Sequence, residues 1–304
     1  MWNPHVIVAG HHVAIIPLAL LGLFIGYVAG MFGVGGGFLL TPILSVVFRI
    51  PIQIAVGSAL CQKVGTSVAS FLKYRYYRRG EPRFDWIMMA GSVLGVDAGT
   101  RLLKYLSTMH RLPIGHEPSL GLVIIEAVYA VMLTFTIWLS VREALRAAKR
   151  AEPRGDLTIP GPLSRIRIPP YIDLPNVQLT QVSVPVLAYM GFILGALSGL
   201  LGIGGGVAFM PVLLYGYGLS VRNAAGTGIL LMLVTVITGT IVQGLNGFVS
   251  LPLAMSILIG SSIGSQLGAL TTHRLPNRIL RLLFAGLVAI TVGLILWDLV
   301  ASLT

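Results

Sequence analysis

Lys63 is the residue with the clearest chemical potential in this sequence, because it is a cation inside a long apolar segment, SALCQKVGTS. If that segment crosses a membrane, a charge at its centre costs at least about 2.5–3.5 kcal/mol, so the ammonium is expected to face protein or water. Three interpretations stay open. Lys63 attracts an anion, or it forms a structural ion pair with Asp97 or Glu126, which also lie in apolar segments, or it carries a proton itself.

Two glycine triplets, Gly35–Gly37 and Gly204–Gly206, follow apolar runs and stand 169 residues apart. Each glycine costs a helix about 1 kcal/mol relative to alanine, so each triplet predicts a helix break. A helix that starts after a break presents unbonded N–H groups and the positive end of its dipole, which attract anions. The triplets Gly35, Gly36, Gly37 and Gly204, Gly205, Gly206 therefore predict two half-sites for one anion.

Neutral polar side chains on the same apolar segments suit hydrogen bonding to such an anion. Ser58 and Gln62 precede Lys63, and Thr227 and Gln243 lie on the corresponding segment of the second half. Serine and threonine in helices also bond the preceding turn, so a structural role stays open for them. Asp97 and Glu126 are either carriers of a coupling proton or bonded structural groups.

The composition is that of a multi-pass membrane protein. Of 304 residues, 55% are hydrophobic and only 10% are charged, where soluble domains carry about 25%. The single cysteine, Cys61, excludes an internal disulfide framework. No metal-ligand spacing, phosphate loop or paired catalytic carboxylates are present, so neither an enzyme nor a metal or other cofactor is expected. The basic residues cluster in loops, which argues against nucleic-acid binding.

An internal repeat organises the chain. When the sequence is shifted by 169 residues, eleven glycines between Gly22 and Gly99 fall on glycines between Gly191 and Gly268 without a gap. Each unit reads as five apolar segments, which predicts about ten membrane spans in an all-α fold. The expected segments are 13–33, 37–50, 54–73, 84–105, 118–141, 183–202, 206–219, 223–245, 249–272 and 279–302.

The charge distribution predicts the orientation of these spans. When the loops are assigned alternately to the two sides of the membrane, sixteen of the 21 lysines and arginines fall on the same side. The positive-inside rule identifies that side as the cytoplasm. With five spans per unit, the second unit enters the bilayer inverted, and both termini lie outside. The expected organisation is a first transmembrane repeat at 1–141, a basic, proline-rich cytoplasmic linker at 142–182, and a second repeat at 183–304. The linker is expected to act as a passive tether.

Glycines spaced by four residues form two further patterns, Gly22-x3-Gly26-x3-Gly30 and Gly91-x3-Gly95-x3-Gly99. Such ridges let helix backbones approach closely, and the simplest expectation is that they pack helices within the chain. The same ridges leave a homodimer open.

The doubled motif resembles the TauE/SafE family of sulfite exporters. It reads Gly30-Met31-Phe32-Gly33-Val34-Gly35-Gly36-Gly37 with Pro42, and recurs as Gly199-Leu200-Leu201-Gly202-Ile203-Gly204-Gly205-Gly206 with Pro211. The resemblance implies a secondary transporter in a bacterial-type inner membrane that exports a small sulfur-containing anion, such as sulfite or an organosulfonate. A passive anion channel of the same architecture is the alternative, and an assembly protein without flux is a further rival.

Overall fold

In the part of the chain that the structure describes, the fold is a bundle of helices with two small β-hairpins. It was obtained as a computed structural model, which describes residues 5–8, 11–32, 37–75, 81–108, 120–147, 161–219, 221–272, 283 and 286–297. Every one of the ten expected apolar segments contains a helix, so the all-α prediction is confirmed. The helices are α1 (Ile15–Phe32), α2 (Gly37–Pro42) with η1 (Ile43–Val47), α3 (Ile52–Arg75), α4 (Pro82–Thr108), α5 (Leu120–Ala147), α6 (Val184–Leu201), α7 (Gly206–Pro211) with η4 (Val212–Gly216), α8 (Val221–Leu245), α9 (Leu251–Thr272) and Gly286–Trp297.

The second glycine triplet breaks the chain between α6 and α7, as the sequence predicts. Gly202 ends α6 with a φ of +70°, and Gly204 and Gly205 follow with φ values of +67° and +83°. L side chains rarely adopt this left-handed conformation, so the turn requires glycine. At the first triplet α1 ends at Phe32 and α2 begins at Gly37; Gly35 and Gly36 lie outside the described residues.

The short helix after each break ends in a wide turn at the same repeat position. The N–H of Phe48 donates to the carbonyl of Ile43, and the N–H of Tyr217 donates to that of Val212. At 1.5 Å per residue, eleven helical residues span only about 16 Å. Gly37–Val47 and Gly206–Gly216 are therefore half-helices that start inside the bundle.

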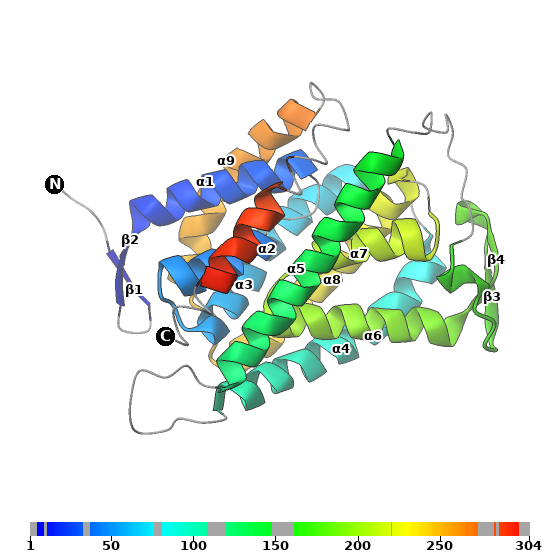
Figure 1. Ribbon diagram of the computed structural model, residues 1–304, viewed down its shortest axis with the longest axis horizontal. Coiled ribbons are helices and arrows are strands. Elements are labelled where there is room, and N and C mark those ends of the chain that lie inside the picture. The colour runs from blue at the N-terminus through cyan, green and yellow to red at the C-terminus, as the bar shows by residue number, and fades with distance from the viewer. Residues whose placement is uncertain are drawn as a thin grey trace.

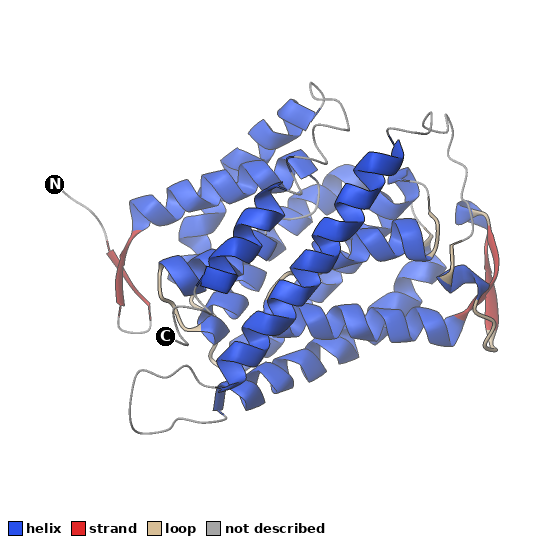
Figure 2. Ribbon diagram, viewed as in Figure 1, coloured by secondary structure: helices blue, strands red, loops and turns tan. Residues whose placement is uncertain are grey.

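Two antiparallel hairpins lie outside the helical body, at its opposite ends (Figure 2). One pairs β1 (His5–Val8) with β2 (His11–Ala14), and the other pairs β3 (Tyr171–Leu174) with β4 (Leu179–Ser183). The second hairpin belongs to the linker region, where short turns η2 (Leu163–Arg165) and η3 (Pro175–Val177) accompany it. Leu174, Val177, Leu179 and Val182 are buried beside Phe84 and Tyr217. This part of the linker therefore packs against the helices.

The glycine ridges bring two pairs of helices into backbone contact, α1 with α9 and α4 with α6, which run side by side in Figure 1. A Cβ added at any ridge glycine would overlap the facing backbone, so the expectation that the ridges pack helices within the chain is confirmed. On α1 and α6 the contacts are Gly22 to Ile257, Gly26 to Ser261, Gly30 to Ser265, Gly191 to Met88, Gly195 to Ser92 and Gly199 to Val96. On α9 and α4 they are Gly260 to Ala19, Gly264 to Leu23, Gly268 to Tyr27, Gly91 to Ala188, Gly95 to Phe192 and Gly99 to Ala196.

These contacts relate the two halves to each other. Every contact that a ridge glycine makes between α1 and α9 recurs, 169 residues away, between α6 and α4. The helix that begins each repeat therefore packs on the helix of the fourth apolar segment of the other repeat. The first half cannot complete its packing without the second, so the two repeats form one folded unit.

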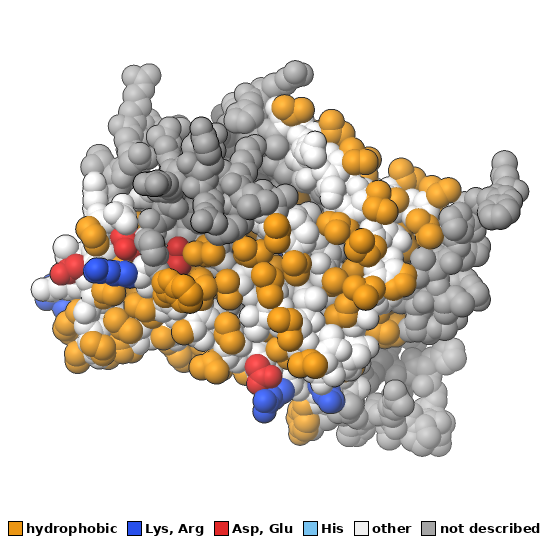
Figure 3. All heavy atoms as spheres, turned by 180° about the vertical axis from the view of Figure 1, so that it is seen from behind, with side chains coloured by type: hydrophobic (Ala, Val, Ile, Leu, Met, Phe, Trp, Pro, Cys, Tyr) orange, Lys and Arg blue, Asp and Glu red, His pale blue; other side chains and the backbone are white. Residues whose placement is uncertain are grey.

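Helix α9 shows the distribution of side chains that suits a lipid environment. Its glycines face α1, while Met255, Ile259, Ile263 and Leu270 are more than half exposed. Hydrophobic side chains cover much of the described part of the face in Figure 3, and the charged ones lie near its edges. Exposed apolar surface of this extent needs an apolar partner. By length and composition alone, two of the described helices, Val184–Leu201 and Leu251–Gly268, are long and apolar enough to cross a membrane.

Gly26→Ala should lower the thermal unfolding midpoint of the detergent-purified protein, because the new methyl group overlaps the backbone of Ser261 and overpacking typically costs about 1–3 kcal/mol. Gly293→Ala is the matched control. It is also helical but has nothing within 4 Å of the added Cβ, so it should leave stability unchanged or raise it by up to about 1 kcal/mol. Equal effects of the two substitutions would contradict the proposed packing.

Candidate anion-binding site

Lys63 lies in the interior of the bundle. It stands near the middle of α3, only 2% of its surface is exposed, and its Nζ has no hydrogen-bond partner among the described residues. A buried charge without a partner is strongly unfavourable, and it is stabilised when an opposite charge binds beside it. An anion bound beside this side chain would stabilise its charge, so Lys63 is a candidate for anion binding.

The ammonium of Lys63 lies against both glycine breaks. A Cβ at Gly37, the first residue of α2, would overlap its Cε and Nζ. A Cβ at Gly204 would lie 2.6 Å from its Cδ and 2.7 Å from its Nζ. Any larger residue at these two positions would occupy the space that the lysine fills. The structure thus brings together three of the expected site residues, one from each break and the lysine between them.

The electrostatics of this arrangement favour an anion. Gly37 starts one half-helix, and Gly206 starts the other one immediately after Gly204 and Gly205. The beginning of a helix carries unbonded N–H groups and a partial positive charge. The ammonium therefore adds to positive potential that the backbone already supplies, and an anion between the breaks would relieve this repulsion.

Val236 and Thr41 complete the surroundings of the two breaks. Val236 Cγ1 lies 2.8 Å from a Cβ placed at Gly204, and Thr41 Oγ1 lies 2.9 Å from one placed at Gly202. Thr41 is one turn beyond Gly37, and Val236 is one turn beyond Met232, the repeat counterpart of Lys63. Sequence reasoning does not single out Thr41 or Val236. Their spacing of one helical turn from Gly37 and Met232 is the signal that could have found them.

The other expected binding residues join neighbouring helices. Ser58 Oγ accepts a hydrogen bond from the N–H of Ser250 at 3.0 Å, and Gln62 Nε2 donates to Ser261 Oγ at 2.6 Å. Gln243 Nε2 donates to the carbonyl of Gly199 at 3.0 Å. These bonds tie α3 to the chain around α9, and α8 to α6. Their roles in substrate binding stay predictions.

The structure places three further expected residues, Gly205, Gly206 and Thr227, at the start of α7 and on α8. Gly205 caps α7, and a Cβ there would overlap the ring of Phe209. Gly206, the first residue of α7, is buried. Thr227 is fully buried on α8 and lies beside the carboxyl group of Asp85.

Sequence reasoning does not single out two buried carboxylates, Glu81 and Asp85, which are 3% and 4% exposed. They stand one turn apart where α4 begins, directly after a basic loop, and so resemble the ordinary acidic start of a helix. Glu81 Oε2 accepts a hydrogen bond from the N–H of Asn176 at 3.0 Å. This bond attaches the linker hairpin to α4.

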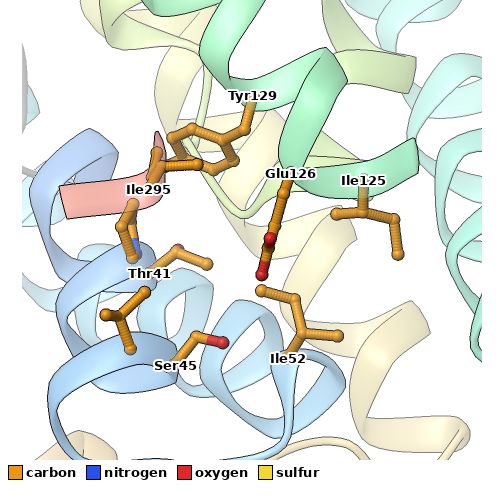
Figure 4. A pocket seen from close by; sticks show the side chains of 9 residues that line it. Thr41, Ser45, Ile52, Ile125, Glu126, Tyr129 and Ile295 are labelled. Carbon is orange, nitrogen blue, oxygen red and sulfur yellow. The ribbon is translucent and has the colours of Figure 1, made fainter. Parts of the chain in front are cut away.

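Asp97 and Glu126, the two candidates for proton coupling, have different environments. Asp97 forms an ion pair of 2.9 Å with Arg101 one turn away on α4, and the two side chains are 42% and 78% exposed. Glu126 on α5 is only 8% exposed and lines a cavity of about 20 Å³. Figure 4 shows its carboxylate directed toward Ser45 and Ile52, with Thr41 and Tyr129 nearby.

Comparison with known proteins identifies the relationship that this geometry suggests. A sequence model of the TauE/SafE sulfite exporters matches residues 18–295, nearly the whole chain. This chain belongs to the TauE/SafE family. As a TauE/SafE protein it is a multi-pass membrane transporter, and the expected resemblance is confirmed.

Relatives from a Bacillus and a Methanocaldococcus species align with this chain along most of its length. The probable membrane transporter protein YdhB of Bacillus subtilis is 23% identical over 269 residues, which cover 88% of this chain and 92% of YdhB. YjnA of the same organism is 26% identical, covering 91% and 97%. A probable membrane transporter protein of Methanocaldococcus jannaschii is 24% identical, covering 90% and 92%. No solved structure matches this chain.

Gly204→Ala should destabilise the protein more than Gly247→Ala does. Both positions have a left-handed backbone, with φ of +67° and +74°, so both substitutions add strain of about 1–2 kcal/mol. Only position 204 also crowds Lys63, since nothing lies within 4 Å of a Cβ at position 247. The measurement is the thermal unfolding midpoint in detergent.

Removal of the lysine side chain supplies the second arm of the same test. If crowding of Lys63 is the cause, Gly204→Ala should cost less in a Lys63→Ala background than in the wild type. Identical costs in the two backgrounds would contradict contact between Lys63 and the second break.

Proposed function

We propose that this protein is a secondary transporter that exports a small sulfur-containing anion, sulfite or an organosulfonate, by alternating access. The observation that carries the proposal is the buried Lys63 ammonium, which lies between Gly37 and Gly204 without a hydrogen-bond partner among the described residues. A sulfur oxyanion would accept hydrogen bonds from this ammonium and from the N–H groups at the start of the half-helices.

Small size is the second property that the site favours in its substrate. The two breaks approach Lys63 so closely that a single methyl group at Gly37 or Gly204 would overlap or crowd it. Sulfite and short sulfonates combine a compact, charged head with several acceptor oxygens. The description of the family as sulfite exporters supports the same class of substrate.

Alternating access follows from the proposed arrangement of ten spans in two inverted repeats. The contacts of α1 with α9 recur between α6 and α4, as a two-fold relation between inverted units requires. The two hairpins at opposite ends of the helical body agree with an N-terminus outside and a linker inside (Figure 2). In this arrangement the anion site lies between the repeats, and rocking of one repeat against the other would expose it to each side in turn.

The proposed location is the inner membrane of a bacterial-type cell, with both termini outside. The exposed apolar side chains of α9 would contact lipid, and the basic loops would face the cytoplasm.

Lys63→Met should reduce the initial rate of uptake of radiolabelled sulfite into proteoliposomes by at least about tenfold, because an interaction of about 1.4 kcal/mol already gives that factor. Methionine occupies the equivalent position, Met232, in the second repeat, so its length and apolar character suit the fold. Lys104→Met is the control. Lys104 is exposed and donates to Asn246 Oδ1, so its loss should leave the rate unchanged.

The same vesicles distinguish the transporter from a channel. Saturable flux with acceleration by unlabelled sulfite on the opposite side identifies a transporter, whereas unsaturable flux identifies the channel. No flux of either sulfite or methanesulfonate above that of empty liposomes would overturn the proposed function.

Inverted topology predicts opposite accessibility at positions 78 and 247, which occupy the same place in the two repeats. In a Cys61→Ser background, Arg78→Cys should react with a membrane-impermeant thiol reagent only from the cytoplasmic side of oriented vesicles. Gly247→Cys should react only from the outside. Labelling of both positions from one side would exclude the inverted repeat.

A further inference from the structure

We infer that Glu126 binds a proton that moves together with the anion, so that transport of a monovalent anion is electroneutral. This inference rests on the proposed function, because it assigns the coupling of the same anion site. Glu126 takes up one proton on the side where the anion binds, forming an O–H bond, and releases it on the side where the anion leaves.

The geometry that points to Glu126 is the small cavity on which its carboxylate lies (Figure 4). Its volume of about 20 Å³ is enough for roughly one water molecule. Thr41, Ser45 and Tyr129 supply hydroxyl groups to its lining, and the remaining lining residues are aliphatic: Pro42, Val46, Ile52, Ile125 and Ile295. A carboxyl group beside a site for one water and several hydroxyls has both a route for a proton and little solvent to stabilise its charge.

The cavity and the anion site share one element, the half-helix made of α2 and η1. Thr41, Pro42, Ser45 and Val46 of this half-helix line the cavity, while Gly37, one turn before Thr41, contacts Lys63. Tyr129, on the same face of α5 as Glu126, donates a hydrogen bond to the carbonyl of Phe38 at 3.1 Å. Glu126 and the anion therefore act on opposite ends of one short segment.

Charges across this segment make proton binding and anion binding favour each other. With Glu126 ionised, its negative charge opposes an anion beside Lys63; with Glu126 protonated, the positive charge of Lys63 stands uncompensated at the breaks. Tyr129 is the other ionisable side chain among the cavity-lining residues, and those from α2, η1, α3 and the C-terminal helix carry no charge. Two unit charges on the order of 10 Å apart, at an effective dielectric constant of about 20, change the affinity for each other's ligands roughly tenfold, which sets the scale of the coupling expected here.

Asp97 serves as the matched control, because it is the other candidate for proton coupling that the sequence offers. It forms an exposed ion pair with Arg101 on α4 and is not among the residues that line the cavity. Asp97→Asn should therefore leave coupling unchanged.

The experiment measures how much radiolabelled anion accumulates in proteoliposomes. The anion is methanesulfonate or sulfite, whichever shows flux that depends on Lys63. Either a pH gradient or a potassium–valinomycin membrane potential is imposed. In the wild type and Asp97→Asn, a pH gradient of about one unit should drive up to about tenfold accumulation of methanesulfonate, and the membrane potential should have no effect. Glu126→Gln should still catalyse exchange of anion for anion, but net flux should follow the potential and ignore the pH gradient.

The outcomes distinguish failure of proton coupling by Glu126 from failure of the proposed anion transport. Potential-driven flux in the wild type, or pH-driven accumulation that survives Glu126→Gln, would overturn the role of Glu126 and leave the anion transporter intact. Absence of flux of both probes would overturn the proposed function and this inference with it. A proton-indicator dye gives an independent check: wild-type protein in detergent should take up protons when sulfite or methanesulfonate binds, and Glu126→Gln should not.

Discussion

The position of a single ammonium group, that of Lys63, is the constraint on which the interior of this protein depends. It lies at the first residue of one half-helix and against the left-handed glycine turn that precedes the other. Both backbones approach it so closely that neither Gly37 nor Gly204 has room for a side chain. The glycine triplets thus do more than end helices, because they leave the space in which a charged side chain meets two helix starts.

Backbone contact between helices provides the framework that holds this arrangement. The ridge glycines of α1, α4, α6 and α9 replace side-chain packing by close approach of the backbones, and the contact pattern of one pair recurs in the other. Without a hydrophobic driving force between helices in lipid, such close contact supplies much of the attraction. Because each repeat packs on the other, the two half-helices meet at the boundary between repeats, where relative motion of the two would act on Lys63.

The sequence predicts the helices well, and it predicts the environment of side chains only where the repeat fixes it. The ten helical segments follow from apolar runs, and the break at Gly204 follows from three consecutive glycines. The glycine ridges also predict close packing of helices, although they do not say which helices pair. By contrast, no local sequence pattern predicts that Gln62 donates a hydrogen bond to Ser261 on α9, because the two residues are 199 positions apart. The hydroxyl-lined cavity of Glu126 likewise depends on α5 lying against α2, and the linker hairpin depends on its contact with Glu81.

The most direct test of the central claim is to locate a bound anion. Selenite has the shape and charge of sulfite, and its selenium atom gives an anomalous X-ray signal. We predict an anomalous peak between the two glycine breaks in crystals grown with selenite, with an oxygen about 3 Å from Lys63 Nζ, and its loss in Lys63→Met. A peak elsewhere that persists in Lys63→Met, with a protein carboxylate paired to Lys63 in the wild type, would show that the lysine is a structural charge and would contradict the account.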